Sequence, residues 1–146
     1  MKKTNILGLI LILVFSNCVD PPEYTDGLLE NIPAIVNESD FFSINLLADK
    51  FSTEESYGLN MTLDSNSVLH TSLRINYSGT ATDSSSITLL TASDTLLMSF
   101  FISGDGSLIL KDSLRDWFAY PQKIDLKTNV FSGTLDYQII KNPGFK

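Results

Sequence analysis

Few residues in this chain have the types and spacing that acid–base or nucleophilic chemistry requires. The 146 residues include one histidine, His70, and one cysteine, Cys18. A Ser-His-acid triad needs a histidine beside an activated serine and a buried acid, but the sequence has no Gly-x-Ser-x-Gly segment. His70 falls on the face of an alternating segment opposite to Leu73 and Ile75. The pattern therefore predicts an ordinary surface histidine.

The acidic residues do not form a recognisable catalytic or metal-binding pattern either. There is no His-x-x-x-His pair, no calcium loop and no glycine-rich phosphate loop. Carboxylates that cleave glycosides can be distant in sequence, but none of the 17 acids stands inside an apolar strand-like segment, where burial would raise its pKa. We expect no enzymatic activity, no catalytic residues, no metal and no cofactor.

One cluster of aromatic residues suggests a ligand platform. Trp117, Phe118 and Tyr120 fall within four positions, and residues 112–120 have the one helix-like pattern in the chain, capped by Ser113 and ended by Pro121. Three aromatic faces together could stack on sugar rings. However, large aromatic side chains in a short crossover usually fill the end of a core, and we favour that interpretation over the exposed platform.

The N-terminal residues carry the most specific signal. Lys2 and Lys3 precede an apolar run from Ile6 to Phe15, which is about half of the roughly 20 residues that a membrane-spanning helix needs. This arrangement is typical of a secretory signal. The following Phe-Ser-Asn-Cys, ending at Cys18, resembles the lipobox of bacterial lipoproteins, in relaxed forms like those of Bacteroidetes and spirochaetes. The resemblance implies lipidation of Cys18; the alternative is ordinary cleavage after Cys18.

The charge balance limits the partners. The formal net charge is -7, and removal of residues 1–17 leaves 8 Lys+Arg against 17 Asp+Glu, a net of -9. Such a surface disfavours nucleic acid. The membrane would then be contacted through the acyl chains. We divide the chain into a signal peptide (1–17), a lipidated cysteine with an extended tether (18–33) and a single β domain (34–146). In the alternative, Leu28, Leu29 and Ile32 pack on the domain as a first edge element.

Alternation of apolar and polar residues predicts β-strands from residue 41 onward. Four segments alternate, at residues 42–46, 57–63, 71–77 and 135–139, and the more apolar runs 87–90 and 96–102 read as central strands. Segments 107–111 and 123–127 complete the set. We expect turns at 64–67 and 127–129, a polar loop at 79–86, and a hairpin at Ser103-Gly104-Asp105-Gly106, in which the glycines take positive φ.

These elements predict an all-β fold: an antiparallel β-sandwich of about seven or eight strands with one short helical crossover. The alternative is a small lipocalin-like β-barrel. Residues 101–108 resemble a hairpin of small bacterial lipocalin-like domains, and residues 131–137 resemble the last strand of small Bacteroidetes lipoproteins of unknown function. Asp94-Thr95-Leu96 and Asp112-Ser113-Leu114 resemble O-glycosylation sites of Bacteroidetes envelope proteins, which implies modification of Thr95 or Ser113.

The sequence favours a non-enzymatic lipoprotein of the bacterial cell envelope that acts as a binding or accessory subunit. The resemblance places it at the outer membrane, on either face, with an envelope protein or a glycan as partner. A lipocalin-like carrier of small ligands is the main alternative, and a small acid-dependent hydrolase is the least favoured.

Overall fold

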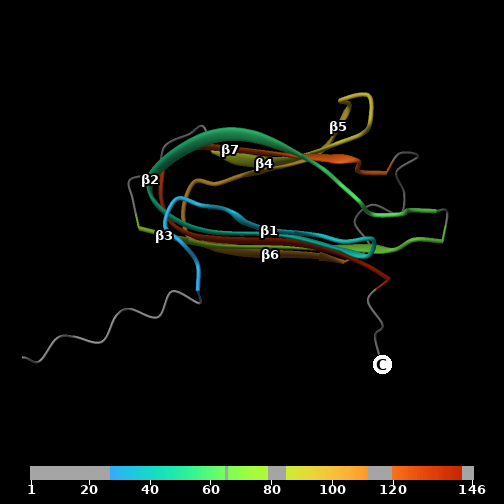
Figure 1. Ribbon diagram of the computed structural model, residues 1–146, viewed down its shortest axis with the longest axis horizontal. Coiled ribbons are helices and arrows are strands. Elements are labelled where there is room, and N and C mark those ends of the chain that lie inside the picture. The colour runs from blue at the N-terminus through green and yellow to red at the C-terminus, as the bar shows by residue number, and fades with distance from the viewer. Residues whose placement is uncertain (1–26, 65, 79–84, 112–119, 143–146) are drawn as a thin grey trace, which may run out of the picture.

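The computed structural model describes residues 27–64, 66–78, 85–111 and 120–142, and in this part of the chain it is all-β (Figure 1). No segment of the described residues is a helix of the length and apolar character that crossing a bilayer demands. Their strands are β1 (Ala34–Asn37), β2 (Phe41–Gly58), β3 (Leu69–Tyr77), β4 (Ser86–Leu90), β5 (Leu96–Phe101), β6 (Gly106–Lys111) and β7 (Lys123–Lys141).

The alternation in the sequence gives each strand one buried face. In β3, Leu69, Thr71, Leu73 and Ile75 are buried, while the residues between them are partly or fully exposed. Phe42, Ile44 and Leu46 in β2 have no exposed surface. A period of two places such residues on one side of a strand, where they can pack against a second layer.

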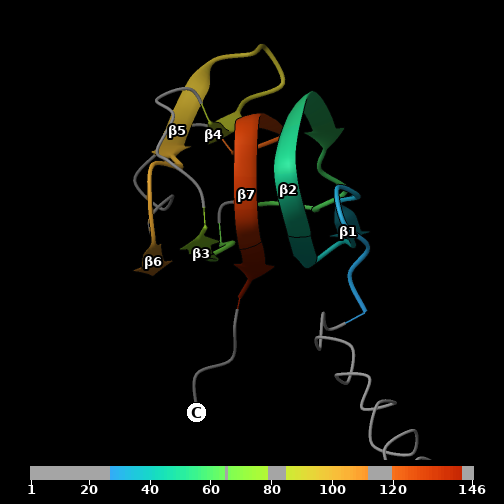
Figure 2. The same cartoon turned by 90° about the vertical axis from the view of Figure 1, so that its left-hand side faces the viewer.

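Two long strands, β2 and β7, build both layers of the fold. Residues 41–48 of β2 pair with residues 133–140 of β7, and residues 51–58 pair with residues 123–131. Beside the first half of this ribbon lie β1, β3 and β6, in the order β1-β2-β7-β3-β6; beside the second half lie β4 and β5. One antiparallel sheet is thereby folded over itself into a sandwich, whose two layers are seen edge-on in Figure 1 and from the side in Figure 2.

Irregular backbone in the middle of β2 and β7 allows the sheet to fold over. The register of the two strands shifts between Ala48 and Thr53, and Lys50, Val130 and Gly133 have positive φ. Serine hydroxyls accept backbone donors there: Lys50 N donates to Ser132 Oγ at 2.8 Å. β-bulges of this type bend a strand and increase its twist. The turn expected at residues 127–129 is therefore wrong, because β7 continues through these residues and bends just after them.

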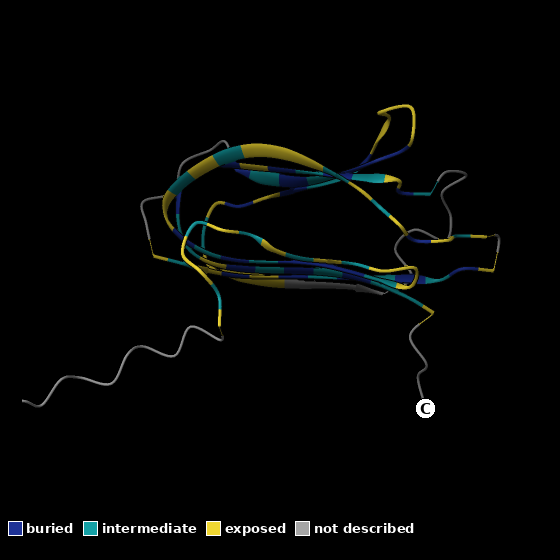
Figure 3. Cartoon of the chain, viewed as in Figure 1, coloured by how far each residue is buried: buried dark blue, intermediate teal, exposed yellow. Residues whose placement is uncertain are grey.

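The core lies between the two layers, as the distribution of buried residues in Figure 3 shows. Its largest fully buried side chains are Tyr137, Phe42 and Phe131. Ring contacts join the layers: Phe42 and Tyr57 have centroids 6.4 Å apart, and Phe100 and Tyr137 have centroids 6.0 Å apart. β1, β5 and β6 lie at sheet edges. The sandwich is thus confirmed, whereas the alternative of a closed barrel is wrong.

Two further elements differ from the sequence-based expectation. The alternating segment 57–63 is not a separate strand: β2 ends at Gly58, and Leu59 continues as a connection, with its N–H bonded to Gln122 O at 2.8 Å. Residues 103–106 are not a hairpin, because β5 pairs with β4 and β6 pairs with β3. This connection crosses from one layer to the other, and Gly104 and Gly106 do not have positive φ. The turn at 64–67 is confirmed by the bond from Ser67 N to Asp64 O.

The segment before β1 is attached to the edge of the first layer. Glu30 forms a parallel bridge with Leu47 of β2. The Asn31 side chain both donates to Asp49 O and accepts from Asp49 N, at 3.2 and 2.9 Å. Leu29 and Ile32 remain 65% and 55% exposed. The end of the expected tether is therefore held by backbone pairing and one amide side chain, and these two apolar residues are not buried in the core. The expected helical crossover at 112–120 lies almost wholly outside the described residues.

Candidate functional site

The outer face of the second layer carries mostly polar side chains. The strand register places Glu54, Lys127, Ser86 and Phe101 in one row across β2, β7, β4 and β5. The next row holds Ser56, Asp125, Thr88 and Ser99. Since alternate residues of a strand point to opposite faces, both rows lie on the side away from the core. We call these eight residues the second-layer face.

Neighbouring side chains on this face bind one another. Ser56 Oγ donates to Asp125 Oδ1 at 2.6 Å, and the hydroxyls of Thr88 and Ser99 are 3.1 Å apart. Lys127 forms an ion pair with Glu54 at 3.4 Å. Cross-strand pairs of this kind fix side chains that would otherwise move freely. The face is therefore an ordered surface of hydroxyl, carboxylate and ammonium groups.

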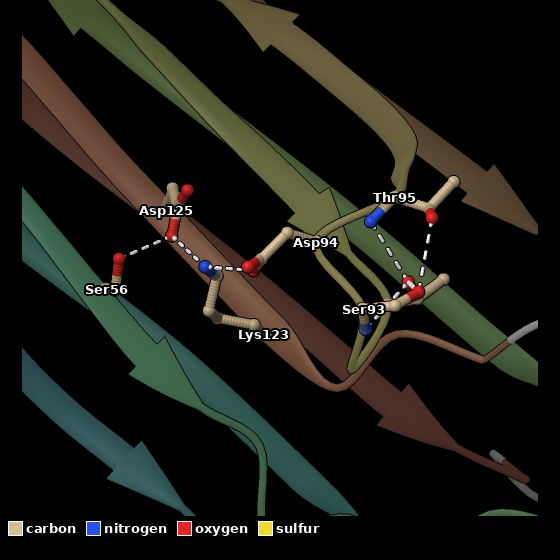
Figure 4. A network of polar contacts seen from close by, with 7 residues as sticks. Ser56, Ser93, Asp94, Thr95, Lys123 and Asp125 are labelled. Carbon is tan, nitrogen blue, oxygen red and sulfur yellow. Dashed lines mark hydrogen bonds and ion pairs between the residues drawn. The ribbon is translucent and has the colours of Figure 1, made fainter.

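A lysine joins the face to the β4–β5 hairpin, as Figure 4 shows. Lys123 Nζ lies 2.5 Å from Asp94 Oδ1 and 3.8 Å from Asp125 Oδ1. The hydrogen bond to Asp94 is the main cause of a raised pKa at Lys123, and the charge of Asp125 adds to it. Lys123 thus stays protonated near neutral pH, as an ammonium group between two carboxylates, and is not suited to act as a proton donor.

The tip of the hairpin carries a cluster of hydroxyls. Thr91 Oγ1 accepts from Thr95 N at 3.1 Å, and the Ser93 hydroxyl lies 3.0 Å from that of Thr91 and 3.3 Å from that of Thr95 (Figure 4). Asp94 has a φ of 58°, a value that aspartate tolerates better than most residues. Thr95 is exposed. The structure thus leaves Thr95 accessible, and its modification remains a prediction.

A groove of about 550 Å³ opens at the β5 edge and is lined by residues of both layers. Its apolar lining comes from Leu73 and Ile75 of β3 and from Phe100 and Phe101 of β5. No ladder joins β5 to β6, so no backbone hydrogen bonds between these two strands close the sandwich at this edge. Phe100 is buried, but Phe101 is 73% exposed. The groove therefore combines a buried apolar floor with an exposed aromatic ring.

Polar groups complete the groove. Ser99 belongs to β5, while Ser103, Asp105 and Ser107 come from the β5–β6 connection and the start of β6. Asp105 Oδ1 accepts from the backbone N–H of Tyr77 at 2.6 Å. This bond ties the connection to the end of β3 and fixes the carboxylate beside the groove. The volume is within the range of small-molecule sites, about 300–1,000 Å³.

The structure describes only some of the residues singled out from the sequence. Cys18, Ser113, Trp117 and Phe118 lie outside the described residues. Tyr120 is described: its hydroxyl donates to Asp64 O at 2.6 Å, which fixes it against the turn at 64–67. Its ring is half-buried. His70 is half-buried on β3, in the layer opposite to the second-layer face. The groove beside Phe101 was not predicted.

Comparison with known proteins adds little. No protein-family model and no curated protein matches the chain. Among solved structures, it is similar to a protein of Bacillus endospore appendages described as a novel family of disulfide-linked pili, with a TM-score of 0.40, 11% identity, and coverage of 75% of this chain and 88% of that chain. It is also similar to the capsular polysaccharide assembling protein CapF of Staphylococcus aureus, with a TM-score of 0.28, 8% identity, and coverage of 79% of this chain and 32% of that chain. These likenesses are loose, and neither bears on function.

Proposed function

We propose that this protein is a lipid-anchored, non-enzymatic component of a bacterial cell envelope, and that its β-sandwich acts as a binding or accessory subunit. The N-terminal pattern supports the anchor: two lysines, an apolar run too short to span a bilayer, and Cys18 at its end. The acidic surface supports an attachment through acyl chains in preference to a basic patch on anionic lipid. We place the protein at the outer membrane.

The observation that carries the binding role is the open groove beside the second-layer face. The polar groups of this face are spread across four strands, and several are paired with one another, such as Ser56 with Asp125 and Thr88 with Ser99. Those of the groove come from β5, the β5–β6 connection and the start of β6. Such groups are arranged to meet another surface or an extended ligand. Catalytic groups instead converge on one reacting atom, at distances near 3 Å.

The attachment of residues 30–31 to β2 suits a short tether. Glu30 stands twelve positions after Cys18, so it can lie at most about 40 Å from the anchored cysteine, at roughly 3.3 Å per residue. The Asn31 side chain fixes the point where the tether leaves the domain. Anchored in this way, the domain stays near the membrane and searches only the nearby envelope for its partner.

The main alternative is a carrier that encloses a small apolar ligand. It requires a closed apolar cavity, whereas the interior between the two layers is filled by side chains such as Phe42, Phe131 and Tyr137. The groove at the β5 edge is lined by serines and Asp105 as well as by apolar residues. These observations favour recognition of a ligand at the surface over its enclosure.

The anchor is tested by metabolic labelling. The full chain and a Cys18→Ala variant are expressed in a diderm bacterium supplied with an alkyne-tagged fatty acid, and the membranes are fractionated. We expect label and outer-membrane location for the wild type, and neither for the variant. Equal membrane association of both proteins, or a wild type without label, would refute the lipoprotein assignment.

A further inference from the structure

The groove between β5 and the β5–β6 connection has the chemistry of a site for a polyhydroxylated ring. Phe101, which is 73% exposed, lines it together with the buried Phe100. An aromatic face offers a large apolar contact area. A pyranose ring has a matching side, made of C–H groups, from which its hydroxyls point outward.

The groove also offers hydrogen-bonding groups of both kinds. The hydroxyls of Ser99, Ser103 and Ser107 each can donate one hydrogen and accept others, and a carboxylate has about four acceptor positions. The bond from Tyr77 N uses one position of Asp105 and holds the group in place. Hydrogen-bond donors and acceptors beside an apolar patch are what a sugar ring requires.

The negative charge of the groove and of the chain limits the class of ligand further. The groove contains the carboxylate of Asp105, and the whole chain carries a net charge of -7. A bound anion would be repelled by both. A neutral sugar would not be repelled, and the amine of an amino sugar would be attracted to Asp105. A fatty acyl chain fits poorly, since three serine hydroxyls and a carboxylate line the groove and would lose water without gaining hydrogen bonds.

We propose that this groove binds a neutral or amine-bearing saccharide, with Phe101 stacked on a ring and Asp105 and the serines bonded to its hydroxyls or amine. The inference rests on the proposed binding role and names its ligand class. It makes the glycans of the envelope, and not the acyl part of its lipids, the surface that the anchored domain recognises.

The test uses the full chain, purified from membranes in a zwitterionic detergent without a sugar head group. The probe is an array of immobilised neutral, amine-bearing and anionic oligosaccharides, and the best binder is then titrated by calorimetry. Phe101→Ala is the main variant. Leu96→Ala is the matched control, because Leu96 is exposed to 57% on the same strand and does not line the groove. Asp105→Asn keeps an oxygen for the Tyr77 N–H bond while it removes the charge.

We expect neutral or amine-bearing glycans to bind and anionic ones to fail. Phe101→Ala should raise the dissociation constant by about tenfold or more, since the loss of one aromatic contact of about 1.4 kcal/mol equals a factor of ten. Leu96→Ala should change it by less than about twofold. Asp105→Asn should weaken amine-bearing glycans more than neutral ones.

Several results would overturn the inference: no binding of neutral or amine-bearing glycans, a preference for anionic glycans, or equal effects of Phe101→Ala and Leu96→Ala. Amide NMR spectra of each variant establish that it is folded. The same preparations are examined for lipid on Cys18. A lipidated protein that binds no saccharide refutes this inference alone, whereas an unlipidated protein that binds one refutes the anchor alone.

Discussion

Replacement of Gly133 by alanine should be the most damaging single-methyl change in the described fold. Gly133 stands where β7 bends between the layers, with a φ of +136°. It pairs with Tyr77 of β3, and a Cβ at this position would overlap the backbone carbonyl oxygen of Asn76. The obstacle is backbone, so it cannot turn aside as a flexible side chain would. β3 and β7 would have to separate locally.

The cost can be estimated from these contacts. A φ this far in the positive region costs a residue other than glycine about 1–3 kcal/mol. Separation of the strands weakens one or two ladder hydrogen bonds, at about 1 kcal/mol each. It also disturbs the contact between the rings of Tyr77 and Phe131, whose centroids are 5.7 Å apart. We expect a loss of about 3 kcal/mol or more, which is a large share of the 5–15 kcal/mol that usually stabilises a domain.

Urea denaturation followed by circular dichroism measures this loss. Gly104→Ala is the matched control, because an added Cβ there meets nothing within 4 Å and its φ is not positive. Gly133→Ala should lower the midpoint by about 1 M urea or more, and Gly104→Ala should leave stability within about 0.5 kcal/mol. Equal midpoints for the two variants, or a larger loss at Gly104, would refute the account of the bend.

Further predictions concern the core, the tether and the undescribed aromatic cluster. Burial raises the pKa of Tyr137 above its usual value, so the folded state keeps the phenol proton when the unfolded chain loses it; stability should be complete below about pH 10 and fall above it. In Tyr137→Phe this fall should be shallower by about 1.4 kcal/mol per pH unit, as urea titrations on both sides of pH 10 would reveal; an unchanged slope would contradict the burial of the hydroxyl. The backbone N–H of Asp49 donates to the Asn31 side chain, so Asn31→Ala should speed hydrogen exchange at Asp49. An unaltered exchange rate would count against the attachment of the tether. Trp117→Ala should cost roughly 3–5 kcal/mol if the indole fills the core; a variant that melts like wild type, with freely quenched fluorescence in the parent, would favour the exposed platform.

The strands could be predicted from the sequence because a strand with one buried face alternates apolar and polar residues. β3, β4 and β5 fall where the alternating and apolar runs stand, and the inward residues Leu73 and Ile87 are buried as expected. A period of two is a local property, so one sequence is enough to reveal it.

The connections were harder, because their form depends on partners far away in the chain. Residues 127–129 look like a turn in the sequence. However, β2, which lies about 75 residues earlier in the chain, keeps this part of β7 paired: Thr53 N donates to Thr128 Oγ1 at 3.1 Å. Gly104 and Gly106 look like hairpin glycines, yet Gly133 is the one whose positive φ and lack of a Cβ the fold requires. Only the three-dimensional approach of Asn76 distinguishes it.

The groove escaped prediction for the same reason. Phe101 belongs to an apolar run, and a run gives no sign of which residue points outward. The pairing of Ser86 with Phe101 and of Ile87 with Phe100 assigns the two neighbours to opposite faces. The one available signal was polar: three serines and an aspartate fall at residues 99–107, on either side of Phe101 in the sequence.

The proposal that this is a lipid-anchored binding protein is tested most directly by the mass of its mature N-terminal peptide, after expression of the full chain in a diderm bacterium. We predict that the mature chain begins at Cys18 and that this residue carries the mass of a diacylglyceryl group, with or without an amide-linked acyl chain. A mature chain that begins after Cys18, or one that begins at Cys18 with a free thiol, would contradict the account.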